Sequence, residues 1–116
     1  MRIAFYAPMK SPDHPTPSGD RRMARALMAA LTLGGHQVDL ASQFRSYDSD
    51  GDRDNQERLR DMGSRLGASM ALKLLDAPET ERPEAWFTYH LYHKAPDWIG
   101  PQISEALGIP YFVAEA

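Results

Sequence analysis

The chain has 116 residues, which fits one small domain, and its formal net charge of −3 and isoelectric point near 5.7 exclude the basic surface that nucleic-acid binding requires. The absence of cysteine excludes disulfides, thiolate metal sites and cysteine nucleophiles. Because no apolar run approaches the roughly 20 residues of a membrane span and no signal-peptide core opens the chain, we expect a cytoplasmic protein without a membrane span.

The first third of the chain predicts a strand, a loop and a helix. The apolar run Arg2–Ala7 is typical of a central strand buried on both faces. Four prolines between residues 8 and 19 predict a loop, and we expect it to be mobile until a ligand orders it. The helix begins at Ser18-Gly19-Asp20 and continues to about Leu33, where Gly34-Gly35 can adopt a left-handed conformation. Its expected core-facing residues are Met23, Leu27, Ala30 and Leu31.

The middle of the chain predicts an exposed strand and a long helix. Apolar and polar residues alternate in the segment His36–Ala41, which indicates a strand at a sheet edge. Gly63 and Gly67 each lower helix stability by roughly 1 kcal/mol relative to alanine, so we expect close packing against a neighbour. The helical stripe consists of Leu59, Met62, Leu66, Met70 and Leu74, and Asp76-Ala77-Pro78 ends the helix.

The last third predicts a strand, a helix and a final short strand. The strands are Ala85–Tyr89 and Tyr111–Ala114. The helix between them is expected at Ala95–Gly108, with Pro101 in its first turn. Its core stripe would be Trp98, Ile99, Ile103 and Leu107. The strand aromatics Trp86, Phe87, Tyr111 and Phe112 are expected in the sheet core.

Regular alternation of strands and helices predicts the fold class. It is α/β, an open, doubly wound parallel sheet of about four strands with helices on both faces and right-handed crossovers. We expect a single Rossmann-like domain over residues 1–116, incomplete at its C-terminal end.

Ligands of such sheets bind beyond the carboxyl ends of the strands, which directs attention to four segments. Ser18 and Gly19 begin a helix after the first strand, where backbone amides can face a phosphate. The competing interpretation is that Ser18 or Asp20 only caps the helix. No dinucleotide or P-loop motif is present, and we expect no cofactor.

The segment from His90 to Lys94 follows the third strand and is the densest cluster of polar rings in the chain. His90, Tyr92 and His93 are candidates for hydrogen bonds to sugar hydroxyls. The alternative is a surface loop whose histidines only pack or cap. No further ligands accompany the two histidines at metal-binding spacing, so we expect no metal.

Three aspartates, Asp48, Asp50 and Asp52, superficially suggest calcium binding. An EF-hand needs glycine and glutamate where this chain has Arg53 and Leu59. We therefore interpret the segment as a solvated acidic turn that favours the start of the following helix.

Three segments in order carry a resemblance to a known family. They are RIAFYAP followed by SGDRRMARALMAAL, then GGHQVDLAS, then AWFTYH with ISEALGIPYFVAEA. Together they resemble the N-terminal, acceptor-side, Rossmann-like half of GT-B glycosyltransferases, particularly the retaining enzymes that use nucleotide sugars. The resemblance covers nearly the whole chain and implies the strand order 2-1-3-4, in which the first and third strands are neighbours.

The resemblance also implies site residues and partners. In this family the loop after the first strand lies near the donor phosphates, and Ser18 and Gly19 match that position. A histidine often follows the family strand that AWFTY matches, and His90 stands there in this chain. Many members have another histidine after the strand matched by YFVA, where this chain has Glu115. The nucleotide-sugar donor belongs mostly to a C-terminal half that is absent, so the chain alone should be inactive.

Two further expectations follow. The last strand lacks lysine or internal proline, so its outer edge should favour self-association of two copies.

The alternative function is a stand-alone flavodoxin-like or receiver-like binding module. A receiver needs an acidic pair after the first strand and an aspartate after the third, where this chain has Ala7-Pro8 and His90-Leu91, and a flavin module needs a phosphate loop where the prolines lie.

Overall fold

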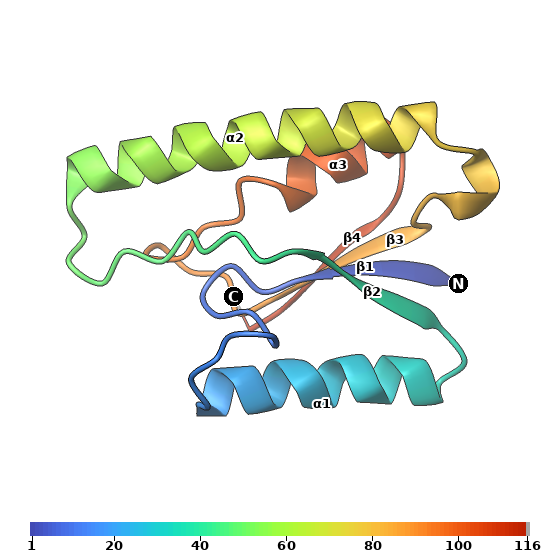
Figure 1. Ribbon diagram of the computed structural model, residues 1–116, viewed down its shortest axis with the longest axis horizontal. Helices are drawn as coiled ribbons and strands as arrows, with labels where there is room; N and C mark the ends of the chain where they lie inside the picture. Colours follow the sequence, from blue (N-terminus) through green and yellow to red (C-terminus); the bar gives the residue numbers. More distant parts are fainter. Residues whose placement is uncertain (116) are drawn as a thin grey trace.

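The computed structural model describes residues 1–115, in which four parallel strands form one sheet in the order β2-β1-β3-β4 (Figure 1). The strands are β1 (Arg2–Tyr6), β2 (Gln37–Ser42), β3 (Ala85–Tyr89) and β4 (Tyr111–Ala114). The helices are α1 (Gly19–Leu33), α2 (Arg53–Asp76) and α3 (Gly100–Leu107), with a short 3-10 turn, η1 (Glu79–Glu81), before β3. The predicted α/β, Rossmann-like sheet and its strand order are confirmed, and the strand bounds differ from those expected by one residue at most.

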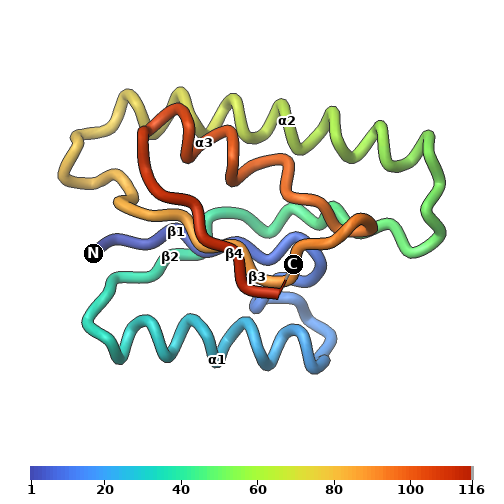
Figure 2. Tube along the Cα trace, turned by 180° about the vertical axis from the view of Figure 1, so that it is seen from behind, coloured from blue at the N-terminus to red at the C-terminus, as the bar shows by residue number. Residues whose placement is uncertain are grey.

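Strand β1 lies in the centre of the sheet, between β2 and β3. Phe5 of β1 is opposite Leu40 of β2 and Phe87 of β3, and Phe87 is in turn opposite Phe112 of β4. Residues 3–6 are all buried, which explains why β1 is apolar throughout instead of alternating. Strand β2 is at one edge, as its alternation predicted, and β4 is at the other, nearest the viewer in Figure 2.

Helix α1 covers one face of the sheet, and α2 and α3 cover the other (Figure 1). The chain moves from β1 to β2 in one direction and then returns past β1 to β3, so right-handed crossovers place α1 and α2 on opposite faces. The buried core on the α2 and α3 side consists of Ala4, Tyr6, Ala71, Trp86, Ile99 and Ile103. The core on the α1 side consists of Phe5, Ala7, Ala24 and Tyr89.

Glycines allow α2 to approach the residues at the start of α3. A Cβ atom on Gly63 would lie 2.8 Å from the Cβ of Trp98, and one on Gly67 would lie 2.6 Å from the side-chain amide of Gln102. The close packing expected from these two glycines is confirmed.

Helix α3 begins at Gly100, five residues later than the sequence suggested. The carboxylate of Asp97 accepts hydrogen bonds from the amides of Ile99 at 3.0 Å and Gly100 at 2.8 Å, so the helix has a side-chain acceptor at its start. Residues 95–99 are therefore not helical, although Ile99 is fully buried in the core. Pro101 lies in the first turn, as predicted.

Several expected core positions are exposed instead. Helix α1 faces the sheet with Ala24, which is buried, and with Leu27, Met28 and Leu31, which are partly buried. Met23 of α1 is 48% exposed and Ala30 is also exposed, because only Leu27 and Leu31 of the expected set face the sheet. Met62 of α2 is 47% exposed. Phe112 is 51% exposed because it lies on the α1 side of β4, whereas α1 packs closest to β2 at the opposite edge.

Within residues 1–115, no helix combines the length and apolarity that crossing a membrane requires.

Candidate functional site

His90 lies at the carboxyl end of β3 in a constrained backbone conformation. Its φ of 63° is in the left-handed region, and its amide donates to the carbonyl of Ala114 at 2.8 Å, which extends the pairing of β3 with β4. Such a conformation is uncommon for a residue other than glycine, although histidine adopts it more readily than most, so the surrounding structure must hold it. The side chain is 30% exposed, so its ring is accessible at the edge of the sheet.

Asp20, in the first turn of α1, contacts His90 across 70 residues of sequence. The Nδ1 atom of His90 lies 2.9 Å from Oδ1 of Asp20, and the aspartate side chain is 20% exposed. The pair exists because β1 and β3 are neighbours, which brings the helix that follows β1 beside the end of β3. Asp20 therefore makes a specific contact with the imidazole in addition to lying in the first turn of α1.

Tyr89 and a second carboxylate, that of Glu115, lie near this pair. Burial raises the pKa of the Tyr89 hydroxyl, and the carboxylates of Asp20 and Glu115 raise the pKa further. Glu115 has a φ of 65°, and its carbonyl accepts from the amide of Leu91 at 2.9 Å, so it lies at the same edge of the sheet as His90. Two carboxylates, those of Asp20 and Glu115, therefore act on this edge.

The aromatic residues after β3 form a continuous row of rings. The rings of His90 and Tyr92 stack with centroids 5.4 Å apart and an interplanar angle of 26°, and His93 meets Tyr92 edge-on at 5.4 Å. Tyr92 also pairs with Ala95 through an isolated antiparallel bridge, which folds the segment into a tight turn. The structure thus brings His90 and Tyr92 together, and His93 lies exposed at the end of the row.

Ser18 and Gly19 are placed for helix capping. The hydroxyl of Ser18 accepts from the amide of Arg21 at 3.1 Å, which makes Ser18 the N-cap of α1. A Cβ atom on Gly19 would meet nothing within 4 Å, so no close approach requires glycine there. The capping interpretation accounts for Ser18, whereas no contact within the described residues 1–115 accounts for glycine at position 19.

The arginines beside this cap hold the proline-rich loop. A shallow cavity of about 200 Å³ is lined by Pro17, Ser18, Arg21, Arg22 and Arg25. Arg21 donates to the carbonyl of His14 at 2.8 Å, and Arg25 donates to the carbonyl of Pro12 at 2.7 Å. The loop was expected to be mobile because it seemed to lack partners, and that premise is wrong. Its mobility stays a prediction.

The acidic turn contains one buried carboxylate. Asp52 caps α2 by accepting from the amide of Asp54 at 3.1 Å, as the sequence suggested. Asp48, in contrast, is only 6% exposed and accepts from the amide of Asp50 at 3.2 Å, so the expected solvated turn is wrong for this residue. Over residues 1–115, no three histidine or carboxylate side chains gather closely enough to hold a metal ion.

A buried polar network centred on Asp97 was not anticipated. Its Oδ2 atom accepts from the hydroxyls of Thr88 and Tyr111, each at 2.6 Å, and the indole of Trp86 donates to Thr88 at 2.9 Å. The network joins β3, β4 and the start of α3, and its members satisfy one another, so its role is structural. The sequence signal was an aspartate three residues before a Gly-Pro pair, a position suited to accepting the first amides of a helix.

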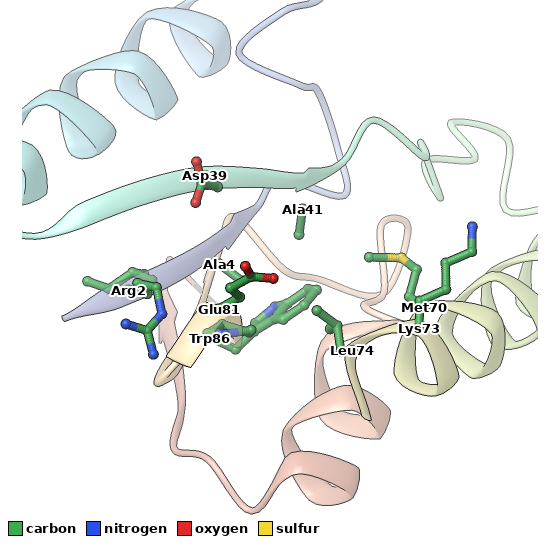
Figure 3. Close-up of a pocket in the computed structure, with 11 residues that line it drawn as sticks. Arg2, Ala4, Asp39, Ala41, Met70, Lys73, Leu74, Glu81 and Trp86 are labelled. Carbon is green, nitrogen blue, oxygen red and sulfur yellow. The ribbon is translucent and has the colours of Figure 1, made fainter. Parts of the chain in front are cut away.

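A larger cavity, of about 300 Å³, lies toward the amino ends of the strands (Figure 3). Ala4, Ala41 and Trp86 give it an apolar lining, and two basic and two acidic side chains, Arg2, Lys73, Asp39 and Glu81, also line it. The cavity exists because α2 packs on α3 instead of directly on β1 and β2. It contains none of the predicted site residues and is separate from the His90 edge.

No protein-family model, curated protein or solved structure matches this chain.

Proposed function

We propose that this chain is part of a glycosyltransferase and contributes the acceptor side of the cleft in which a sugar passes from a nucleotide-sugar donor to a hydroxyl-bearing acceptor. A Rossmann-like sheet hosts many unrelated functions, so the argument rests on the site. The cytoplasmic location expected from the sequence is part of the same proposal.

The observation that carries the proposal is the His90–Asp20 pair at the carboxyl edge of the sheet. A polar group held in place by a carboxylate, at one end of a row of rings whose other end, His93, is exposed, offers both kinds of contact that a sugar can use. Hydroxyls hydrogen-bond to the imidazole, and the apolar C–H face of a sugar ring covers an aromatic ring. The position agrees with the general location of ligands in open parallel sheets.

The proposal assigns acceptor binding to His90, Tyr92, His93 and Glu115, with Ser18 and Gly19 facing the donor side. Donor activation would depend mainly on positioning and on stabilising the charge of the leaving phosphate, both of which require groups on two sides of a closed cleft. The chain by itself should therefore not transfer sugar from any nucleotide sugar. Turnover at the rate of an intact transferase would contradict this division of roles.

Titration of the ¹⁵N-labelled chain with free monosaccharides and disaccharides tests the proposal. We expect chemical-shift changes at the amides of His90, Tyr92 and Glu115, and we expect His90→Ala to abolish them. His36→Ala is the matched control, because His36 lies at the amino end of β2, on the opposite side of the sheet. If millimolar saccharide leaves the His90 edge unchanged in the wild-type chain, acceptor binding at this edge is wrong.

The proposal includes pairing of two copies through β4. The outer edge of this strand is unpaired within residues 1–115, and its side chains Phe112 and Val113 are 51% and 38% exposed. An edge strand with exposed apolar side chains is a template for another strand.

A further inference from the structure

The hydrogen bond between His90 and Asp20 fixes the tautomer of the neutral imidazole. A carboxylate can only accept hydrogen bonds, so the hydrogen in the 2.9 Å contact must lie on Nδ1 of His90. The lone pair of the neutral ring then lies on Nε2, and no group within residues 1–115 donates to that atom. Nε2 therefore has a lone pair that can accept a hydrogen bond from a ligand.

Contacts with two aromatic rings keep the imidazole in this orientation. Tyr92 stacks on the imidazole at 5.4 Å, and the ring of Tyr89 is tilted against it at 5.6 Å. The backbone of His90 is fixed by its hydrogen bond to Ala114. An acceptor held by four neighbours is preorganised, which lowers the entropy lost when a ligand binds.

The surroundings of the ring disfavour an anion. Asp20 is in direct contact with it, and Glu115 lies at the same sheet edge. The side chains of Arg21 and Arg25 donate to carbonyls of the proline-rich loop. The hydroxyl of Ser18 accepts from Arg21 within the cap. A phosphate at His90 would face two carboxylates and an imidazole that offers a lone pair.

We infer that Asp20 is a positioning residue that holds His90 as a hydrogen-bond acceptor, so that this edge of the sheet binds a neutral hydroxyl group and not a phosphate. The inference rests on the proposed function for the identification of the hydroxyl as that of a sugar acceptor. The tautomer and the preference for a neutral donor follow from the residues alone. We therefore expect any phosphate contact to lie away from the His90 edge.

Imidazole ¹⁵N NMR of the labelled chain tests the tautomer without any ligand. At about pH 9 we expect the neutral ring of His90 to carry its proton on Nδ1. His93 gives an internal reference from the same spectrum, since its exposed ring has no hydrogen bond within residues 1–115. Asp20→Asn should abolish the preference for Nδ1–H at His90 while leaving the amide spectrum of the sheet unchanged. A wild-type ring protonated on Nε2 would overturn the inference.

Parallel titrations test the ligand class. We expect methyl glycosides to shift the His90 ring resonances and inorganic phosphate to shift them at least about tenfold more weakly, and Asp20→Asn should weaken the glycoside response by about tenfold, the factor that corresponds to 1.4 kcal/mol. A phosphate response at His90 as strong as that of the glycosides would overturn the inference. Protonation on Nδ1 with no glycoside binding would contradict the proposed function and the neutral-ligand class but keep the tautomer. Glycoside binding to a ring protonated on Nε2 would contradict the inference alone.

Discussion

The hydroxyl of Tyr111 donates to Oδ2 of Asp97 at 2.6 Å, and this contact ties β4 to the segment that begins α3. The same carboxylate accepts from Thr88 of β3 and from the amides of Ile99 and Gly100. Asp97 is 8% exposed, so water has little access to this site and each donor needs the carboxylate as its hydrogen-bond acceptor. The attachment of the edge strand β4 to the rest of the fold therefore depends in part on one aspartate.

Replacing Asp97 should be among the most destabilising changes in the chain. Asp97→Ala leaves two hydroxyls and two amides without their acceptor, and we expect a loss of about 3 kcal/mol or more in the free energy of unfolding in urea. Tyr111→Phe removes a single donor and should cost about 1 to 3 kcal/mol. Asp61→Ala, at a largely exposed site of α2, is the control. An effect of Asp97→Ala no larger than that of the control would show that the network does not stabilise the fold.

Alkaline unfolding should depend on Tyr6. Burial, followed by the charge of Asp97, raises the pKa of its hydroxyl far above the ordinary value of 10.0. Below pH 10 the hydroxyl is protonated in both the folded and unfolded states, so its contribution is complete. Above pH 10 the unfolded chain loses the proton first, and the free energy of unfolding falls as pH rises toward the raised pKa.

Tyr6→Phe removes this titration. In urea unfolding measured from neutral pH to above pH 10, we expect the variant to lose stability less steeply, by about 1.4 kcal/mol per pH unit. At neutral pH the variant should be the less stable protein, because it lacks the 2.8 Å hydrogen bond to the carbonyl of Phe44. Parallel curves for the two proteins above pH 10 would contradict the assignment.

Alanine at the packing glycines of α2 should destabilise the protein although alanine favours helices. At Gly63 the new methyl group would meet the Cβ of Trp98, which cannot move without the backbone, so we expect a loss of about 1 to 3 kcal/mol in thermal or urea unfolding. Gly67→Ala should cost less, because the amide of Gln102 is the end of a flexible side chain. Ser69→Ala, exposed on the same helix, is the control and should change little. Stabilisation by Gly63→Ala would refute the close contact between α2 and the residues before α3.

Self-association through β4 should depend on its exposed side chains. Light scattering of the chain at high micromolar concentration is expected to give the mass of a dimer, and Val113→Lys should give a monomer, since lysine on an edge strand opposes pairing. Leu72→Lys is the matched control, because Leu72 is 70% exposed on α2, outside the sheet. A monomer mass for the wild-type chain at that concentration would rule out the pairing.

The sequence by itself determined the elements and their order. Apolar runs bounded by proline and glycine located all four strands, and the regular alternation with helices implied a parallel sheet, because short connections leave few other arrangements. The cap at Ser18 and the close packing at Gly63 and Gly67 could also be predicted, since capping and glycine spacing are local properties. His90 was identified as a candidate because it directly follows a strand.

Only the tertiary structure decided which residues meet. The partner of His90 is 70 positions away, and the partners of Asp97 come from two strands and a helix start, so no local pattern contains either contact. The orientation of α1 that exposes Met23 and buries Ala24 also depended on the sheet, because apolar residues on neighbouring helical positions are nearly equivalent until a surface selects one face. Phe112 is exposed for the same reason: burial depends on what lies opposite a side chain, and that information is absent from a strand pattern.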